Sequence, residues 1–161
     1  MRENPGESYP TDFEVDAFQR ATRDLIGVAL HSLEILDGEV TLPQFRMMLV
    51  LDDLGETPSS RVASALGLAA SSVTRLADRL DASGHVLRGT DARSRSVVTL
   101  DLTEHGREVV RRVLAWRHHE LARILSGLDP EERAATVAGL ASFHLVVGEE
   151  YTADLHGPVP L

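Results

Sequence analysis

The chain has 161 residues, about the length of one folded domain, and its 43% hydrophobic and 25% charged residues are ordinary for a soluble globular protein. It contains no cysteine, which excludes a disulfide framework, a thiolate zinc site and a thiol-based redox switch. The net charge of −9 argues by itself against a nucleic-acid partner, but residues 61–95 hold six arginines against three aspartates, so one basic segment lies inside an acidic chain.

Both ends of the chain are predicted to be flexible tails. Residues 1–11 are polar and contain two prolines and a glycine, and residues 151–161 also contain two prolines. The first residues lack the basic-then-apolar order of a signal peptide, and no apolar run approaches the roughly 18 residues of a membrane span. We therefore expect a cytoplasmic protein without a membrane segment.

Two helices are predicted before the basic segment. From Phe13 to Leu36, apolar residues recur at spacings of three or four, which places them in one stripe along a long helix that Gly38 ends. Thr41 and Gln44 then have the spacing of a capping box ahead of an apolar run. The capping box predicts a second helix that ends at Gly55.

Two short helices are predicted next. Residues 57–60 (TPSS) indicate a helix start with Pro58 at the first helical position, and Gly67 breaks this helix after about two turns. Another helix begins near Ala69 or Ala70 and ends at Gly84; its inward-facing residues are Val73, Leu76, Ala77 and Leu80. Two short helices around a glycine turn are typical of a helix-turn-helix.

A β-hairpin and two long helices complete the predicted fold. Residues 85–88 and 97–102 alternate in the manner of paired strands, and the long loop between them, residues 89–96, carries Asp91 and two arginines. One helix then begins after Thr103 and keeps helical spacing to Gly127, and the last begins at residues 129–132 and runs to about residue 150. The fold class is therefore mainly α with a small β-hairpin wing, a winged helix-turn-helix plus a helical region.

Five motifs in this order resemble the MarR family of bacterial regulators. They are residues 42–45 (LPQF), 62–68 (VASALGL), 71–80 (SSVTRLADRL) followed by Gly84, 91–95 (DARSR) and 102–107 (LTEHGR). The resemblance covers residues 13–150, and Ser94 departs from it because the family often has an acidic residue there.

The resemblance implies that the chain has two functional regions. Residues 12–38 and 103–150 would form a helical dimerisation region, and residues 39–102 would form a winged helix-turn-helix DNA-binding domain. The implied partners are a second copy of the chain and double-stranded DNA with a pseudo-palindromic operator. The apolar surface of the first and last helices exceeds what one lobe can hide, which agrees with an interface.

The candidate DNA contacts lie on the second short helix and in the hairpin loop. They are Ser71, Ser72, Thr74, Arg75 and Arg79 on the helix, and Arg93 and Arg95 at the wing tip. Arg75 has the donors to pair with guanine O6 and N7 in the major groove, and the wing arginines suit the narrow minor groove. For Arg79, an ion pair with Asp78 or Asp91 is the favoured alternative, and a solvated helix face is the alternative for the whole set.

The resemblance also implies a small-molecule pocket between the dimerisation region and the DNA-binding lobe. In the family such pockets often suit aromatic or phenolic acids, so the implied protein is a repressor released by an effector of that kind. The candidate lining residues are His31, Phe45, Arg46, Met48, Trp116 and His119. Each of them has packing as its alternative role, and Arg46 carries the charge that would neutralise a carboxylate.

The sequence also bears on three other function classes. A zinc-responsive regulator of the same fold is possible because His31 and Glu34 lie one turn apart and residues 118–120 (HHE) offer further ligands, although adjacent helical residues point about 100° apart. A winged-helix module for protein association is a second alternative. An enzyme and a bound cofactor are not expected, since the chain has no glycine-rich phosphate loop, nucleophile motif or recognisable carboxylate pair.

Overall fold

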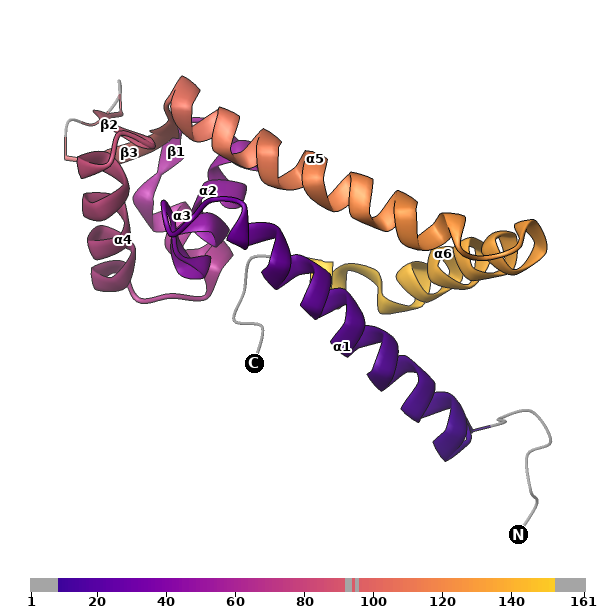
Figure 1. The fold of residues 1–161 in the computed structure, drawn as a ribbon. Coiled ribbons are helices and arrows are strands. Elements are labelled where there is room, and N and C mark those ends of the chain that lie inside the picture. Colours follow the sequence, from indigo (N-terminus) through magenta and orange to yellow (C-terminus); the bar gives the residue numbers. More distant parts are fainter. Residues whose placement is uncertain (1–8, 92–93, 95, 153–161) are drawn as a thin grey trace, which may run out of the picture.

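The computed structural model describes residues 9–91, 94 and 96–152, with side chains described up to residue 147. Within these residues the elements are α1 (Asp12–Glu34), α2 (Leu42–Leu54), β1 (Thr57–Pro58), α3 (Ser59–Leu66), α4 (Ala70–Ala82), β2 (Val86–Thr90), β3 (Val98–Leu102), α5 (Glu104–Ser126) and α6 (Pro130–Thr152). Figure 1 shows a lobe made of α2, α3, α4 and the strands, from which α1 and α5 extend as long arms. Helix α6 turns back from the far end of α5, and we call α1, α5 and α6 together the arms.

The hydrophobic core lies in the lobe, around α2. Five residues of α2 are fully buried, namely Phe45, Met47, Met48, Val50 and Leu51. They belong to one cluster with buried residues of α3, α4, the sheet and the first half of α5, including Val62, Leu66, Val73, Leu80, Leu100, Leu102, Val109 and Val113. Because α5 contributes to this core, the lobe and the arm are packed together and not merely linked.

The sheet has three antiparallel strands in the order β1-β3-β2, so the predicted two-stranded hairpin is incomplete. Residues Thr57 and Pro58 pair with Leu100 and Thr99. The prediction that Pro58 is the first helical residue is wrong, because Pro58 is extended (φ −58°, ψ 138°) and is the N-cap of α3. Proline has no N–H to donate to a ladder, which suits it to this short edge strand.

The ends of the first two helices are set by local signals. The capping box predicted for α2 is confirmed, since Gln44 Oε1 accepts the backbone N–H of Thr41 at 2.8 Å. A second capping box, between Thr11 and Glu14, starts α1 and was not predicted. Helix α1 ends at Glu34 and not at Gly38, because residues 35–38 form a turn in which Gly38 has a φ of 81°.

The arms carry much of the exposed apolar surface. Among the described residues, Phe13 and Phe18 of α1 and Leu145 and Val146 of α6 are exposed. The rings of Phe18 and Phe143 lie 5.1 Å apart, so α1 and α6 of one chain touch at their apolar faces. No helix in the described ranges is both long and apolar enough to cross a membrane.

Candidate nucleic-acid interface

Helix α4 is presented by a tight glycine turn at the end of α3. Gly67 adopts a left-handed conformation (φ 61°, ψ 31°), and the N–H of Leu68 donates to the carbonyl of Ala63 at 3.0 Å to close the turn. The inward residues of α4 are buried as predicted: Val73, Ala77 and Leu80 lie in the core, and Leu76 packs against it. The opposite side of α4 therefore faces away from the lobe.

The five predicted contact residues of α4 lie on this outward side. Ser71, Thr74, Arg75 and Arg79 are exposed, and Ser72 is half-buried. Among the described residues, the Arg75 side chain makes a single weak polar contact, from Nη2 to Ser72 Oγ at 3.4 Å. The N-cap of α4 is Ala69, whose side chain cannot accept a hydrogen bond, so the first backbone N–H groups of the helix have no side-chain acceptor in the described part of the chain.

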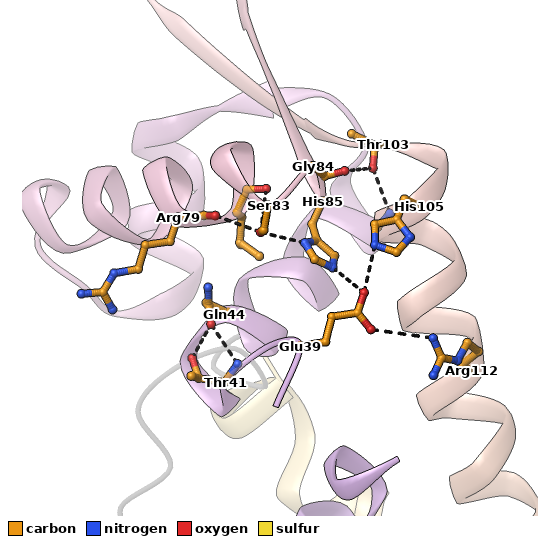
Figure 2. A network of polar contacts seen from close by, with 12 residues as sticks. Glu39, Thr41, Gln44, Arg79, Ser83, Gly84, His85, Thr103, His105 and Arg112 are labelled. Carbon is orange, nitrogen blue, oxygen red and sulfur yellow. Dashed lines mark hydrogen bonds and ion pairs between the residues drawn. The ribbon is translucent and has the colours of Figure 1, made fainter. Parts of the chain in front are cut away.

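The ion pair expected between Arg79 and Asp78 does not form. Asp78 Oδ1 instead accepts Arg88 Nη2 at 2.6 Å, and no ion pair or hydrogen bond of the Arg79 guanidinium is found among the described residues. Figure 2 shows the Arg79 side chain pointing away from the neighbouring polar network. Arg79 is thus an exposed cation beside Arg75 on the same helix.

Arg88 is a structural partner of α4 that the sequence analysis missed. This residue lies on β2, and besides its ion pair with Asp78 it donates to the carbonyl of Thr74 at 3.2 Å and lies 3.8 Å from Asp81. It therefore fixes the first strand of the wing against the outer side of α4. The sequence pattern that could have predicted this contact is a pair of aspartates, Asp78 and Asp81, three positions apart on α4 and followed by an arginine on the next strand.

The wing strands approach each other closely near their tip. A Cβ on Gly89 would lie 2.7 Å from Thr99 Oγ1, so a larger residue at this close approach would force the Thr99 side chain to move. Thr99 Oγ1 also donates to Glu56 Oε1 at 2.9 Å, which ties β3 to the segment before β1.

Ser94 makes hydrogen bonds that stabilise the described part of the wing loop. Its backbone N–H donates to Asp91 Oδ1 at 3.2 Å, and its hydroxyl lies 2.9 Å from that of Ser96. The N–H of Val97 then donates to the carbonyl of Ser94 at 3.0 Å. Arg93 and Arg95, the predicted minor-groove contacts, lie outside the described residues.

The far end of α4 is fastened to the start of α5. Gly84 (φ 75°) and His85 close the helix with bonds to the carbonyls of Asp81 and Leu80, the pattern of a Schellman motif. Thr103, the N-cap of α5, donates its hydroxyl to the carbonyl of Gly84 at 2.7 Å, and its N–H donates to the carbonyl of His85 at 3.0 Å. The orientation of α4 is therefore coupled directly to that of α5.

The six predicted effector residues occupy different environments. Phe45 and Met48 are fully buried in the core, Arg46 and Trp116 are half-buried, and His31 and His119 are exposed. Two cavities, of about 680 and 420 Å³, lie instead between α1 and α6, and none of the six is among their described lining residues. The larger is lined by Phe18, Arg23 and Phe143 among others.

Arg117 of α5 is a further residue that the sequence analysis overlooked. Its guanidinium donates to Ser32 Oγ at 2.7 Å and lies 5.4 Å from the centre of the Phe45 ring. Burial lowers its pKa, and no acidic side chain among the described residues pairs with it. The sequence signal for Arg117 was its position in line with the apolar residues of α5, four residues after Val113 and four residues before Leu121.

The zinc ligands suggested by the sequence do not form a cluster. His31 and Glu34 are 3.9 Å apart, but both are exposed, and a hydrogen bond from Arg123 to Glu120 lowers the pKa of that carboxyl. In the described part of the chain, neither they nor His118 and His119 belong to a group of three adjacent ligand atoms. Such a group does occur elsewhere, at Glu39, His85 and His105.

Comparison with known proteins identifies related regulators. No protein-family model matches the chain. The uncharacterised HTH-type transcriptional regulator YfiV of Bacillus subtilis is 33% identical over 103 residues, which are 64% of this chain and 64% of YfiV, so the match spans less than two thirds of that relative.

Solved structures match over a larger share of the chain. RV1404 from Mycobacterium tuberculosis has a TM-score of 0.81 at 33% identity, covering 89% of this chain and 99% of that one. A MarR family protein from Bacillus stearothermophilus has a TM-score of 0.72 at 24% identity, covering 86% and 99%, and this likeness shows a shared fold.

Proposed function

The chain belongs to the MarR family of winged helix-turn-helix regulators, and we propose on this premise that it is a homodimeric transcription regulator that binds pseudo-palindromic double-stranded DNA. One observation carries the proposal. The outward side of α4 presents Arg75 and Arg79 without an acidic partner among the described residues, next to a wing that Arg88 holds in place. The basic segment of the chain therefore coincides with the helix-turn-helix, whereas the rest of the chain is acidic.

The N-terminal half of α4 suits the major groove. Small residues at 70–72 allow a close approach, and the hydroxyls of Ser71, Ser72 and Thr74 can donate to base edges or phosphates. The uncapped N–H groups at the start of α4 favour a phosphate there. Arg75 has room to form two bonds to guanine, and Arg93 and Arg95 would enter the minor groove from the wing.

The proposed dimer uses the arms. Residues on α1 and α6 expose apolar side chains, with Leu145 81% and Val146 87% exposed in the isolated chain. Exposed apolar side chains of this number and size favour an interface, and a two-fold axis between the arms would present α4 twice to successive half-sites. The two cavities between α1 and α6 lie on this same surface.

The finer part of the proposal is repression relieved by an aromatic or phenolic acid. Arg117 supports it, because a half-buried guanidinium that packs on Phe45 and has no described acidic partner offers a charge for a carboxylate. Addition of benzoate should lower the affinity for operator DNA and should raise the melting temperature of the protein. Unchanged DNA binding and melting across a panel of aromatic acids would remove the effector from the proposal.

The first experiment identifies the operator and tests Arg75. Genomic fragments retained by the full-length protein are sequenced, and affinities for the recovered site are measured for Arg75→Ala. We expect a loss of about 1–3 kcal/mol, concentrated at one base pair of each half-site. By contrast, Arg93→Ala should weaken binding to all sequences evenly and should lower the salt slope by about one.

Arg20→Ala is the matched control, because Arg20 is an exposed arginine on α1. It should bind the operator as the wild type does. Equal affinity of Arg75→Ala and Arg20→Ala would overturn the placement of α4 in the groove. Failure of the wild-type protein to retain any duplex at low salt would overturn the proposed function itself.

A further inference from the structure

Three polar side chains from distant parts of the chain converge behind α4. They are Glu39 from the turn between α1 and α2, His85 from the Schellman motif that ends α4, and His105 from the first turn of α5 (Figure 2). The Nε2 atoms of His85 and His105 lie 3.1 and 2.9 Å from the same oxygen, Glu39 Oε1. All three ligand atoms lie within 4.8 Å of one another, which is a distance that a single metal ion can span.

Ser83 orients the His85 ring as the residues around a metal site orient its ligands. Ser83 Oγ lies 2.8 Å from His85 Nδ1 and 2.9 Å from the carbonyl oxygen of Arg79. When the Ser83 hydroxyl donates to that carbonyl, its oxygen accepts a hydrogen bond from the Nδ1–H of His85, which leaves the Nε2 lone pair available to a metal ion held between His85 and Glu39. Metal-bound histidines have this arrangement, with the second ring nitrogen donating to an oxygen.

Access and charge also fit a metal ion. His85 is 2% exposed, whereas the side chains of His105 and Glu39 are 53% and 29% exposed, so an ion and a water ligand can reach the cluster from one side. Arg112 Nη1 lies 3.8 Å from the other carboxylate oxygen, Oε2, and leaves Oε1 to face the imidazoles. The guanidinium thus orients the carboxylate without occupying the position between the rings.

The ligand types select the metal. Two imidazole nitrogens and one carboxylate oxygen, in a chain without cysteine, suit zinc with a water as fourth ligand, whereas magnesium and calcium prefer oxygen ligands throughout. We propose that Glu39, His85 and His105 form a zinc site. This site is distinct from the ligands that the sequence suggested.

Zinc at this position would connect three elements that set the position of α4. His85 immediately follows the C-terminal turn of α4, His105 lies in the first turn of α5, and Glu39 ends the turn that follows α1. Binding fixes the distance between the arms and the end of α4, and so shifts the protein toward one spacing of its DNA-binding surfaces. This regulatory consequence rests on the proposed function, whereas zinc binding does not.

The direct test is metal binding by the full-length protein. Zinc is titrated in competition with a chromogenic chelator, and Co²⁺ is added separately to record the visible bands of a tetrahedral site. We expect one zinc per chain, a Co²⁺ spectrum of tetrahedral type and no competition from Mg²⁺. His105→Gln and Glu39→Gln should each weaken zinc binding at least tenfold.

His31→Gln and His119→Gln are matched controls, since both remove an exposed histidine outside the cluster, and neither should change the zinc affinity. Metal-free melting temperatures establish that each variant is folded. Zinc binding by His105→Gln as tight as by the wild type overturns the site, as does loss of binding in the control variants.

Measuring operator affinity in the presence of zinc and in the presence of a chelator distinguishes failure of the zinc site from failure of the proposed function. Zinc should change the affinity of the wild type for DNA at least tenfold, and it should leave His105→Gln unaffected. Stoichiometric zinc binding by a protein that ignores DNA refutes the proposed function and leaves the site standing. Operator binding that responds to pH in the presence of chelator, and not to zinc, identifies a proton as the occupant and overturns the zinc assignment.

Discussion

Arg75 and Arg88 lie close to each other on the lobe and have opposite roles. Arg88 is held by Asp78 at 2.6 Å and by the carbonyl of Thr74, so its charge is already matched within the lobe. Arg75 has only the 3.4 Å contact with Ser72. Because a partly exposed ion pair contributes only about 0.2–1 kcal/mol to stability, the value of Arg88 lies in orienting β2 against α4.

Gly106 lies where the start of α5 comes very close to the backbone of His85. A Cβ at this position would fall inside the van der Waals radius of the backbone oxygen of His85 and would lie 3.2 Å from Leu102 Cδ2. A backbone oxygen cannot move aside as the end of a flexible side chain can. The start of α5 must therefore shift if any other residue replaces this glycine.

Gly106→Ala should consequently lower the free energy of unfolding by about 1–3 kcal/mol, measured by urea denaturation. Gly27→Ala is the control, because nothing lies within 4 Å of a Cβ at that position in α1. Alanine there should be neutral or stabilising by up to about 1 kcal/mol. Equal stability of the two variants would contradict the close contact between α5 and His85.

At the scale of elements, the beginning of α6 depends on one carboxylate. Asp129 Oδ1 accepts the backbone N–H groups of Glu131 and Glu132 at 2.8 and 2.9 Å. The hydrogen bond from the N–H of Glu132 is the main reason that the pKa of Asp129 lies below its ordinary value. A lowered pKa in the folded protein means that the carboxylate stabilises the fold above the pKa of the unfolded chain.

This stabilisation should be lost as the pH falls from the ordinary carboxyl pKa through the lowered one. Asp129→Asn keeps a good capping side chain but cannot titrate, so the stability difference between it and the wild type should shrink on acidification. Chemical denaturation at neutral pH and at about pH 3 measures it. A difference that stays constant or grows on acidification would show that the cap is not charged in the folded protein.

At the scale of the whole molecule, the lobe is complete in one chain and the arms are not. The lobe has a continuous buried core, whereas α6 exposes apolar residues along its length. An apolar surface of this extent is expected to be buried in an interface, and we propose that a second copy of the chain buries it. DNA binding by two lobes would then depend on how the arms pair.

Leu145→Glu tests the pairing, since it places a charge on the surface that the second copy should cover. We expect the dimer dissociation constant to rise at least tenfold, about 1.4 kcal/mol, in analytical ultracentrifugation, and operator affinity to fall with it. The control is Leu87→Glu, the same exchange at an exposed position of β2. A dimer that is weakened by Leu87→Glu and not by Leu145→Glu would place the interface on the lobe.

The sequence by itself determined the six helices, two of the three strands and the outward side of α4. Each of these depends on residues close together in the chain: the spacing of Val73, Ala77 and Leu80, the glycines at 67 and 84, and the capping box of Thr41 and Gln44. Local signals of this kind act within a few residues. The exposure of Arg75 follows from them, because burying one side of a helix leaves the other outside.

Only the tertiary structure decided the contacts between distant residues. The pairing of Thr57 with Leu100, the clamp of Arg88 on α4 and the burial of Arg117 between α1 and α5 depend on how whole elements pack. The meeting of Glu39 with His85, 46 residues later, is of the same kind. A pattern read along the chain contains the residue types at such sites, but their distances are fixed by packing, because side chains far apart in sequence become neighbours only when the core forms.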